Sequence, residues 1–294
     1  MLVSMKEILA DAVKGNYAVG GFNCASLESA MGAIRASEEL GIPFVLQHAP
    51  AHEKYIPLAV AGPIMIQLAR AAKTPVAVHL DHGDSIEVCL RALAMGFTSV
   101  MFDGSALPYE ENMKATAFVA KTAHALGATT EAELGSMPHN FNGELKEYTP
   151  EDFYTKPDEA AQFVQTTGVD ALAISFGTVH GVYKTTPKLS FDVIDEVRKS
   201  TGDLPLVMHG GSGLSANDYH QAISKGIRKI NYYTYGVKYA GEAVEKVIAD
   251  FKAKNADANV YWHDMTMAAY DCLVDDFTKV IKVFANGVGL MIAI

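Results

Sequence analysis

Cysteine is scarce in this sequence, and its arrangement excludes two kinds of site. The 294 residues include three cysteines, Cys24, Cys89 and Cys272. They form no CxxC pair and their number is odd, so the sequence indicates neither a disulfide framework nor a thiolate zinc site. This usage favours a reducing, cytoplasmic compartment.

An excess of positive charge is also missing. Lysine and arginine number 24 against 34 acidic residues, which gives a formal net charge of −10. Proteins that hold nucleic acid or anionic membrane by general electrostatics need basic stripes, so we expect neither partner. No uncharged apolar run reaches the ~18 residues of a membrane-spanning helix, and charged residues near Met1 interrupt any secretory signal, so we expect neither insertion nor export.

The sequence does contain eight short β-type apolar runs, with helical patterns between them. Several runs, such as 171–174, are continuous rather than alternating, as in parallel strands covered on both faces. Segments 27–40 and 84–95 have helical spacing and end before Gly41 and Gly96. The expected strands are 17–23, 43–48, 75–81, 98–103, 128–134, 170–176, 204–209 and 227–233.

This alternation predicts an α/β fold, a (β/α)₈ TIM barrel formed as a single domain over residues 1–294, with a C-terminal helical segment at about 238–294. The alternative is an open doubly wound sheet, but no GxGxxG follows the first strand. Residues 136–155 form the longest polar connection between strands, and such loops are usually functional lids.

Three histidines follow strands at the rim where a barrel enzyme carries its reactive groups. His82 closes the third strand, His180 follows the sixth, and His209 closes the seventh. Each alone is more often a hydrogen-bonded structural residue. Together, three imidazoles with an open fourth position are what a catalytic Zn²⁺ requires.

Asp81 stands beside His82 and has two interpretations. It orients that ligand or transfers a proton to a substrate oxygen, or it simply caps the following helix. His79 lies on the same strand face, where a supporting hydrogen bond is favoured over ligation.

Glycine-rich turns after strands expose backbone N–H groups that can hold a phosphate. One turn, 210–213, precedes a helix expected near Ser215, and another, 180–184, carries Lys184. Asn231 and Thr234 close the eighth strand, where barrels commonly bind phosphate.

These motifs resemble the class II, metal-dependent fructose- and tagatose-bisphosphate aldolases. The similarity runs to about residue 250 and rests on HLDHG, EAELG, GTVHGVYK, PLVMHGGSGL and KIN, in that order. The resemblance implies a zinc-dependent lyase of carbohydrate metabolism, a homodimer or homotetramer. Such an enzyme cleaves a phosphorylated sugar, a ketose phosphate, to dihydroxyacetone phosphate and an aldehyde.

The resemblance also implies roles for individual residues. His82, His180 and His209 would bind Zn²⁺, with Glu133 beside it, and Asp81 would carry the proton of the C4 hydroxyl. Asn231 would contact the dihydroxyacetone portion, and Asn23 joins the substrate-binding candidates. The residues expected around the C1 phosphate are Gly181, Lys184, Gly211, Ser212 and Thr234.

Two departures from the family pattern concern the chemistry and the substrate. Phe141 stands where the family's loop has the glutamate that handles the C3 proton, so His139 or Glu144 takes that role or the chemistry differs. At the far end of the substrate, Ala49 replaces a serine, Tyr233 replaces aspartate or alanine, and residues 257–268 contain no arginine. We therefore expect the C1 phosphate to be bound and a distal phosphate not to be.

Two other functions stay open at this point. Three histidines and an aspartate also suit a metal-dependent hydrolase. A non-catalytic sugar-phosphate-binding protein that has lost its loop glutamate would retain the same residues.

Overall fold

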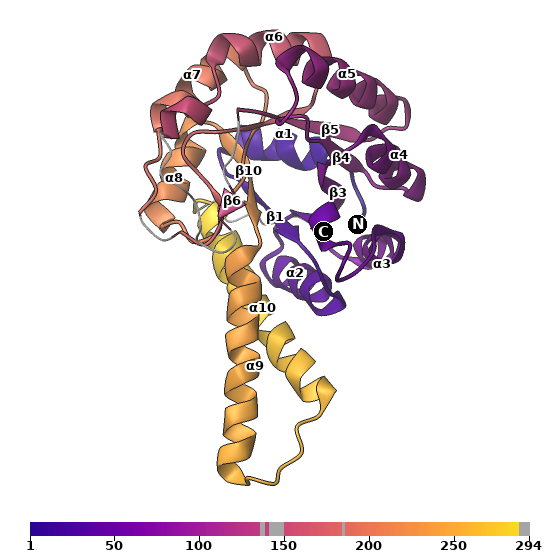
Figure 1. Cartoon of the computed structure of the whole chain (residues 1–294), viewed down its shortest axis with the longest axis vertical. Coiled ribbons are helices and arrows are strands. Elements are labelled where there is room, and N and C mark those ends of the chain that lie inside the picture. Colours follow the sequence, from indigo (N-terminus) through magenta and orange to yellow (C-terminus); the bar gives the residue numbers. More distant parts are fainter. Residues whose placement is uncertain (136–138, 141–149, 184–185, 288–294) are drawn as a thin grey trace.

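The computed structural model is a closed barrel of eight parallel strands surrounded by helices (Figure 1). It describes residues 1–135, 139–140, 150–183 and 186–287, and only the backbone of His139, Asn140 and Pro150. The ring order is β1, β2, β3, β4, β5, β7, β9 and β10, and β10 pairs with β1. This confirms the predicted single-domain (β/α)₈ barrel and excludes the open sheet.

The elements begin and end close to the predicted positions. The barrel strands are β1 (Val19–Asn23), β2 (Phe44–His48), β3 (Val76–Gly83), β4 (Ser99–Phe102), β5 (Thr129–Leu134), β7 (Ala171–Ile174), β9 (Leu206–Met208) and β10 (Ile227–Tyr232). A separate parallel pair joins β6 (His139–Asn140) to β8 (His180–Gly181). The helices are α1 (Met5–Gly15), α2 (Leu27–Leu40), η1 (Pro50–His52), α3 (Leu58–Ala71), α4 (Ile86–Met95), α5 (Tyr109–Ala125), η2 (Pro150–Phe153), α6 (Pro157–Thr167), α7 (Phe191–Thr201), α8 (Ala216–Lys225), α9 (Thr234–Lys254) and α10 (Trp262–Phe284).

Helix α1 closes the N-terminal end of the barrel. Its apolar face, with Met5 and Leu9, packs against inward side chains such as Val19, Val45 and Val207 in one buried cluster. Because α1 fills this end with apolar side chains, polar and charged groups can reach the barrel axis mainly at the opposite, C-terminal end of the strands.

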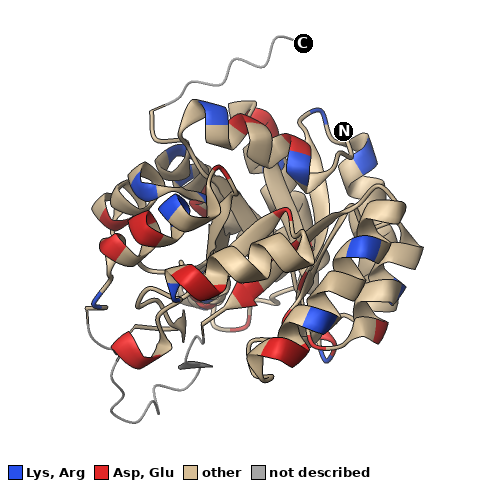
Figure 2. Ribbon diagram, turned by 90° about the horizontal axis from the view of Figure 1, so that it is seen from above, with Lys and Arg blue, Asp and Glu red and all other residues tan. Residues whose placement is uncertain are grey.

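Helices α9 and α10 form an arm that projects from the barrel (Figure 1). The second half of α10 returns to the barrel wall, where Leu273, Phe277 and Ile281 join the core and the Phe277 ring lies 4.5 Å from that of Phe22. Basic and acidic residues are interspersed over the helices in view (Figure 2). Among the described residues, no helix combines the length and apolarity needed to cross a membrane.

Candidate active site

Three imidazoles converge at the C-terminal mouth of the barrel. His82 is the second-last residue of β3, His180 begins β8, and His209 directly follows β9. The ring centroids of His82 lie 4.5 Å from His209 and 5.0 Å from His180, and those of His180 and His209 lie 5.9 Å apart. One ligand nitrogen from each ring lies within 4.8 Å of the other two. The structure therefore brings together the three histidines that the sequence singled out.

A β-bulge directs two consecutive side chains of β3 toward this mouth. Leu80 pairs with Val100 and Gly83 pairs with Phe102, so β3 contains one residue more than β4 over this stretch. His82 in the bulge has a φ of +48°, a conformation that few non-glycine residues adopt. Adjacent strand residues normally face opposite sides, and the bulge allows Asp81 and His82 to serve one site.

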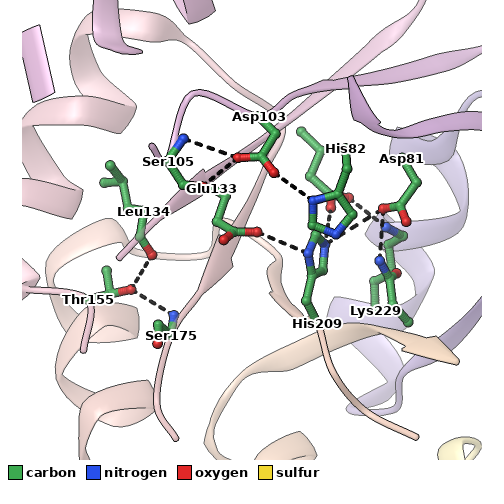
Figure 3. Close-up of polar contacts among 12 residues, drawn as sticks. Asp81, His82, Asp103, Ser105, Glu133, Leu134, Thr155, Ser175, His209 and Lys229 are labelled. Atoms are coloured by element: carbon green, nitrogen blue, oxygen red, sulfur yellow. Dashed lines mark hydrogen bonds and ion pairs between the residues drawn. The ribbon is translucent and has the colours of Figure 1, made fainter. Parts of the chain in front are cut away.

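Two carboxylates orient two of the imidazoles. Asp103 Oδ2 lies 2.7 Å from His82 Nδ1 (Figure 3). Glu131 Oε1 lies 2.9 Å from His209 Nε2. These contacts leave Nε2 of His82 and Nδ1 of His209 as the nitrogens available to a metal. Carboxylates in this position fix the orientation and basicity of metal-binding imidazoles. Neither Asp103 nor Glu131 is among the site residues predicted from the sequence.

Glu131 is itself held by a buried lysine. Both side chains are fully buried, and Lys229 Nζ lies 2.8 Å from Glu131 Oε2. Burial raises the pKa of Glu131, but the charge of Lys229 and the hydrogen bond of His209 outweigh it and leave the pKa at about 2. Burial lowers the pKa of His209, but Glu131 and Glu133 outweigh it and raise that pKa to about 10. His79 bonds Ser99 Oγ at 2.7 Å, in keeping with a supporting role.

Asp81 is fixed by amide donors at the centre of the mouth. Its Oδ2 accepts from Asn23 Nδ2 at 2.8 Å and its Oδ1 from Asn231 Nδ2 at 2.9 Å, while Gln47 Nε2 donates to Asn23 Oδ1 at 2.8 Å. Burial opposes ionisation, but the charges of His82, His209 and Lys229 lower the pKa of Asp81 far below its usual value. The helix-cap interpretation of Asp81 is wrong, because the residue that caps α4 is Ser85, whose hydroxyl accepts from Val88 N.

Glu133 lies beside the other ring nitrogen of His209, Nδ1. Its Oε2 is 3.1 Å from His209 Nδ1, but the contact lacks hydrogen-bond geometry, and neither atom has a hydrogen-bond partner among the described residues (Figure 3). Both residues are buried. A buried carboxylate oxygen and a buried ring nitrogen that face each other without a bond suit a shared cation, since each is a ligand atom for Zn²⁺.

Three of the proposed phosphate residues, Gly211, Ser212 and Thr234, lie at or near the start of α9. Gly210 has a φ of +64°, and a Cβ on Gly211 would lie 2.8 Å from Asn231 O, so this turn requires glycine. Ser212 Oγ accepts from Tyr233 N at 2.9 Å, and Thr234 is the first residue of α9. Gly181 lies in β8.

Three further predicted site residues are Lys184, Glu144 and His139. Lys184 and Glu144 lie outside the described residues. The backbone of His139 pairs with that of His180 between β6 and β8, which places residue 139 next to a metal-ligand candidate.

Comparison with known proteins identifies the family. A family model described as fructose-bisphosphate aldolase class-II matches residues 3–286. The chain belongs to this family. It is 40% identical to the fructose-bisphosphate aldolase of Staphylococcus epidermidis over 266 residues, which cover 88% of each chain. It is also 40% identical to a probable fructose-bisphosphate aldolase of Bacillus subtilis over 251 residues, 84% of this chain and 87% of that one.

A solved structure is similar to this chain over almost its whole length. The YdjI aldolase from Escherichia coli K12 has a TM-score of 0.83 and 34% sequence identity, and the match covers 97% of both chains. The residues of the present site fit a divalent metal on their own chemistry: three imidazoles converge, carboxylates orient two of them, and Glu133 offers a further oxygen.

Proposed function

We propose that this class II aldolase uses a divalent cation, Zn²⁺ in the first instance, to cleave a ketose phosphate reversibly into dihydroxyacetone phosphate and an aldehyde. The observation that carries the proposal is the convergence of His82, His180 and His209 beside the ionised carboxylate of Asp81. A cation bound by these imidazoles would withdraw electron density from the ketone carbonyl and stabilise the negative charge that develops as the C3–C4 bond breaks.

Asp81 takes the proton from the C4 hydroxyl in this proposal. The electron pair of the C3–C4 bond stays with the dihydroxyacetone phosphate half, and the other half leaves as an aldehyde. Two amide donors, from Asn23 and Asn231, fix both carboxylate oxygens, so Asp81 is oriented before the substrate binds. Asn231 in addition contacts the dihydroxyacetone portion.

A residue of the loop after β5 returns a proton to C3. His139 and Glu144 are the two candidates, and the pairing of β6 with β8 supports His139, because residue 139 is the backbone partner of His180 in this pair. Loss of hydrogen exchange at dihydroxyacetone phosphate in H139A, but not in E144A, would assign the C3 proton transfer to His139. The reverse result would assign Glu144.

The C1 phosphate binds at the N-terminus of α9. No side-chain hydrogen bond caps this helix of 21 residues, whereas Ser215 caps α8 and accepts from Asp218 N. The free N–H groups of the first turn and the positive end of the helix dipole suit a phosphate. The backbone of Gly181 and Gly211, the hydroxyls of Ser212 and Thr234, and the charge of Lys184 complete the site. No comparable site is proposed for a distal phosphate.

We also propose that the enzyme is a homo-oligomer in which a second copy covers the α9–α10 arm. Trp262 is 75% exposed at the start of α10, and large apolar side chains remain exposed along both helices. Solitary exposed apolar residues are ordinary, but a group on one projecting element indicates an interface. The exposed group comprises Val237, Tyr239, Phe251, Tyr261, Trp262 and Met267. Light scattering would show a dimer or tetramer, and a monomer would refute this proposal.

The direct test is a coupled assay for dihydroxyacetone phosphate after exhaustive chelation and after reloading with zinc. We expect chelation to abolish its release and zinc to restore it. Metal-dependent hydrolysis without release of dihydroxyacetone phosphate would indicate a hydrolase. Binding of the sugar phosphate without turnover over a panel of aldehydes would indicate a non-catalytic binding protein.

A further inference from the structure

Two aromatic side chains form a pair at the mouth of the barrel that the proposed mechanism does not use. The ring centroids of His52 and Tyr233 lie 4.8 Å apart, with planes tilted by 43°. His52 ends η1, after β2, and Tyr233 joins β10 to α9. Because β1 lies between β2 and β10 in the barrel, this pair spans the mouth above the end of β1, where Asn23 holds Asp81.

The pair also adjoins both the proposed phosphate turn and the catalytic carboxylate. Tyr233 N donates to Ser212 Oγ at 2.9 Å, so the backbone of Tyr233 is part of the phosphate turn. His52 is near enough to Asp81 and His82 for both charges to act on its ring. A ketose whose C1 phosphate binds at α9 and whose C4 hydroxyl meets Asp81 has its remaining carbons next to this pair.

Each ring offers one hydrogen-bond donor toward this space. His52 Nδ1 accepts from Ala49 N at 3.4 Å, which leaves the proton of a neutral ring on Nε2. Burial lowers the pKa of His52 to about 4 and raises that of Tyr233 to about 12, so the ring is neutral and the phenol protonated near pH 7. Neither His52 Nε2 nor the Tyr233 hydroxyl has a partner among the described residues, and neither atom is fully enclosed.

The charge around the pair disfavours an anionic group. A phosphate here would lie near the negative carboxylate of Asp81. It would also exchange part of its hydration shell for contact with two uncharged rings, which is costly for an unpaired charge. Lys54 stands on the same rim, but its Nζ lies 4.7 Å from the centroid of the Tyr55 ring, and that residue is 62% exposed. Lys54 therefore faces solvent in a surface cation–π pair.

We infer that His52 and Tyr233 are specificity-determining residues that bind the aldehyde half of the substrate and select an uncharged, hydroxylated acceptor. The His52 N–H and the Tyr233 O–H donate to hydroxyls of the acceptor, and the ring faces pack against its carbon chain. This inference rests on the proposed aldolase function, since it assigns the acceptor of that reaction.

The experiment measures kcat/KM for addition of dihydroxyacetone phosphate to three aldehydes: propanal, glyceraldehyde and glyceraldehyde 3-phosphate. The informative quantity is the ratio of glyceraldehyde to propanal, which reports the hydroxyls alone. Wild type is expected to favour glyceraldehyde over both others. Y233F should lower the ratio about threefold to tenfold, the loss of one neutral hydrogen bond. H52F should do the same, while H52Q, which keeps an N–H donor, should retain most of the preference.

Two further variants act as controls. Y109F removes a phenol from the start of α5, where Tyr109 donates to Glu159 O at 2.8 Å away from the mouth of the barrel, and should leave the ratio at the wild-type value. K54M tests the nearby cation. A wild type that prefers glyceraldehyde 3-phosphate, with the preference lost in K54M, would overturn the inference in favour of a distal phosphate site at Lys54. Unchanged ratios in Y233F and H52F would also overturn it.

Hydrogen exchange at dihydroxyacetone phosphate in D₂O, without any aldehyde, separates this inference from the proposed function. If the wild type exchanges this hydrogen but the variants keep the wild-type ratio, the proposed aldolase function stands and the acceptor site is refuted. If the zinc-loaded wild type neither exchanges this hydrogen nor condenses the two substrates, the proposed function is refuted, and the inference is refuted with it.

Discussion

The buried pair of Lys229 and Glu131 allows a quantitative test of how the site is supported. Both side chains are fully buried and their charged atoms lie 2.8 Å apart. Removing one partner of a buried ion pair typically costs about 3–5 kcal/mol, because the other charge is left without compensation. In K229M, His209 still contacts Glu131 at 2.9 Å, so we expect a loss near the lower limit, about 3 kcal/mol.

The double variant K229M/E131Q removes both charges and should be more stable than K229M. Replacing a buried pair by uncharged groups of similar size is often close to neutral. We expect K229M/E131Q to recover at least about 2 kcal/mol of the loss, a coupling within the range for groups in direct contact. Its zinc affinity should still fall about 10-fold to 100-fold, because an amide in place of the Glu131 carboxylate no longer orients His209 as a metal ligand.

Thermal unfolding of metal-free protein measures the effect, since bound metal would mask it. At about 2–4 °C per kcal/mol, K229M should unfold roughly 6–12 °C below wild type. The matched control is K246M, because Lys246 lies at the same 2.8 Å from Asp250 with both side chains largely exposed. It should change stability by less than about 0.5 kcal/mol. A double variant less stable than K229M would refute the reasoning.

Two further variants test the orientation of the site. D103N should weaken zinc binding about 10-fold to 100-fold in a calorimetric titration while the protein stays folded, because Asp103 Oδ2 lies 2.7 Å from His82 Nδ1 and orients that ring. An unchanged zinc affinity would mean that Asp103 has no part in orienting His82. G21A should lower kcat by roughly 100-fold, because the added Cβ would displace the amides that hold Asp81. This Cβ would overlap Gln47 Oε1 and would lie 2.7 Å from Asn231 Oδ1. A normal kcat in a folded G21A would contradict this role of the amide network.

The barrel could be predicted from the sequence because its strands are buried on both faces. Runs such as Ala171–Ile174 contain only apolar residues, and the position of each strand end then placed His82 and His209 at one rim. The same rule applied to the fourth strand would have directed attention to Asp103. Charged residues inside apolar strands, Glu131 and Lys229, were a second available signal, because buried charges require partners.

Other features depend on contacts that no local pattern contains. The bulge that turns both Asp81 and His82 to the mouth arises from the register between β3 and β4, which sequence periodicity does not report. Asp81 is held by Asn231, 150 residues away, and the ring of His52 meets that of Tyr233 only because β2 and β10 flank β1. Closure of the barrel creates these contacts.

The central claim is that His82, His180 and His209 hold one divalent cation. The most direct measurement is anomalous diffraction at the zinc absorption edge from a crystal of zinc-loaded protein. We predict a single strong peak about 2.0–2.1 Å from one nitrogen of each of the three imidazoles. A peak bound by other residues, or none at these three rings in a fully active crystal sample, would contradict the account.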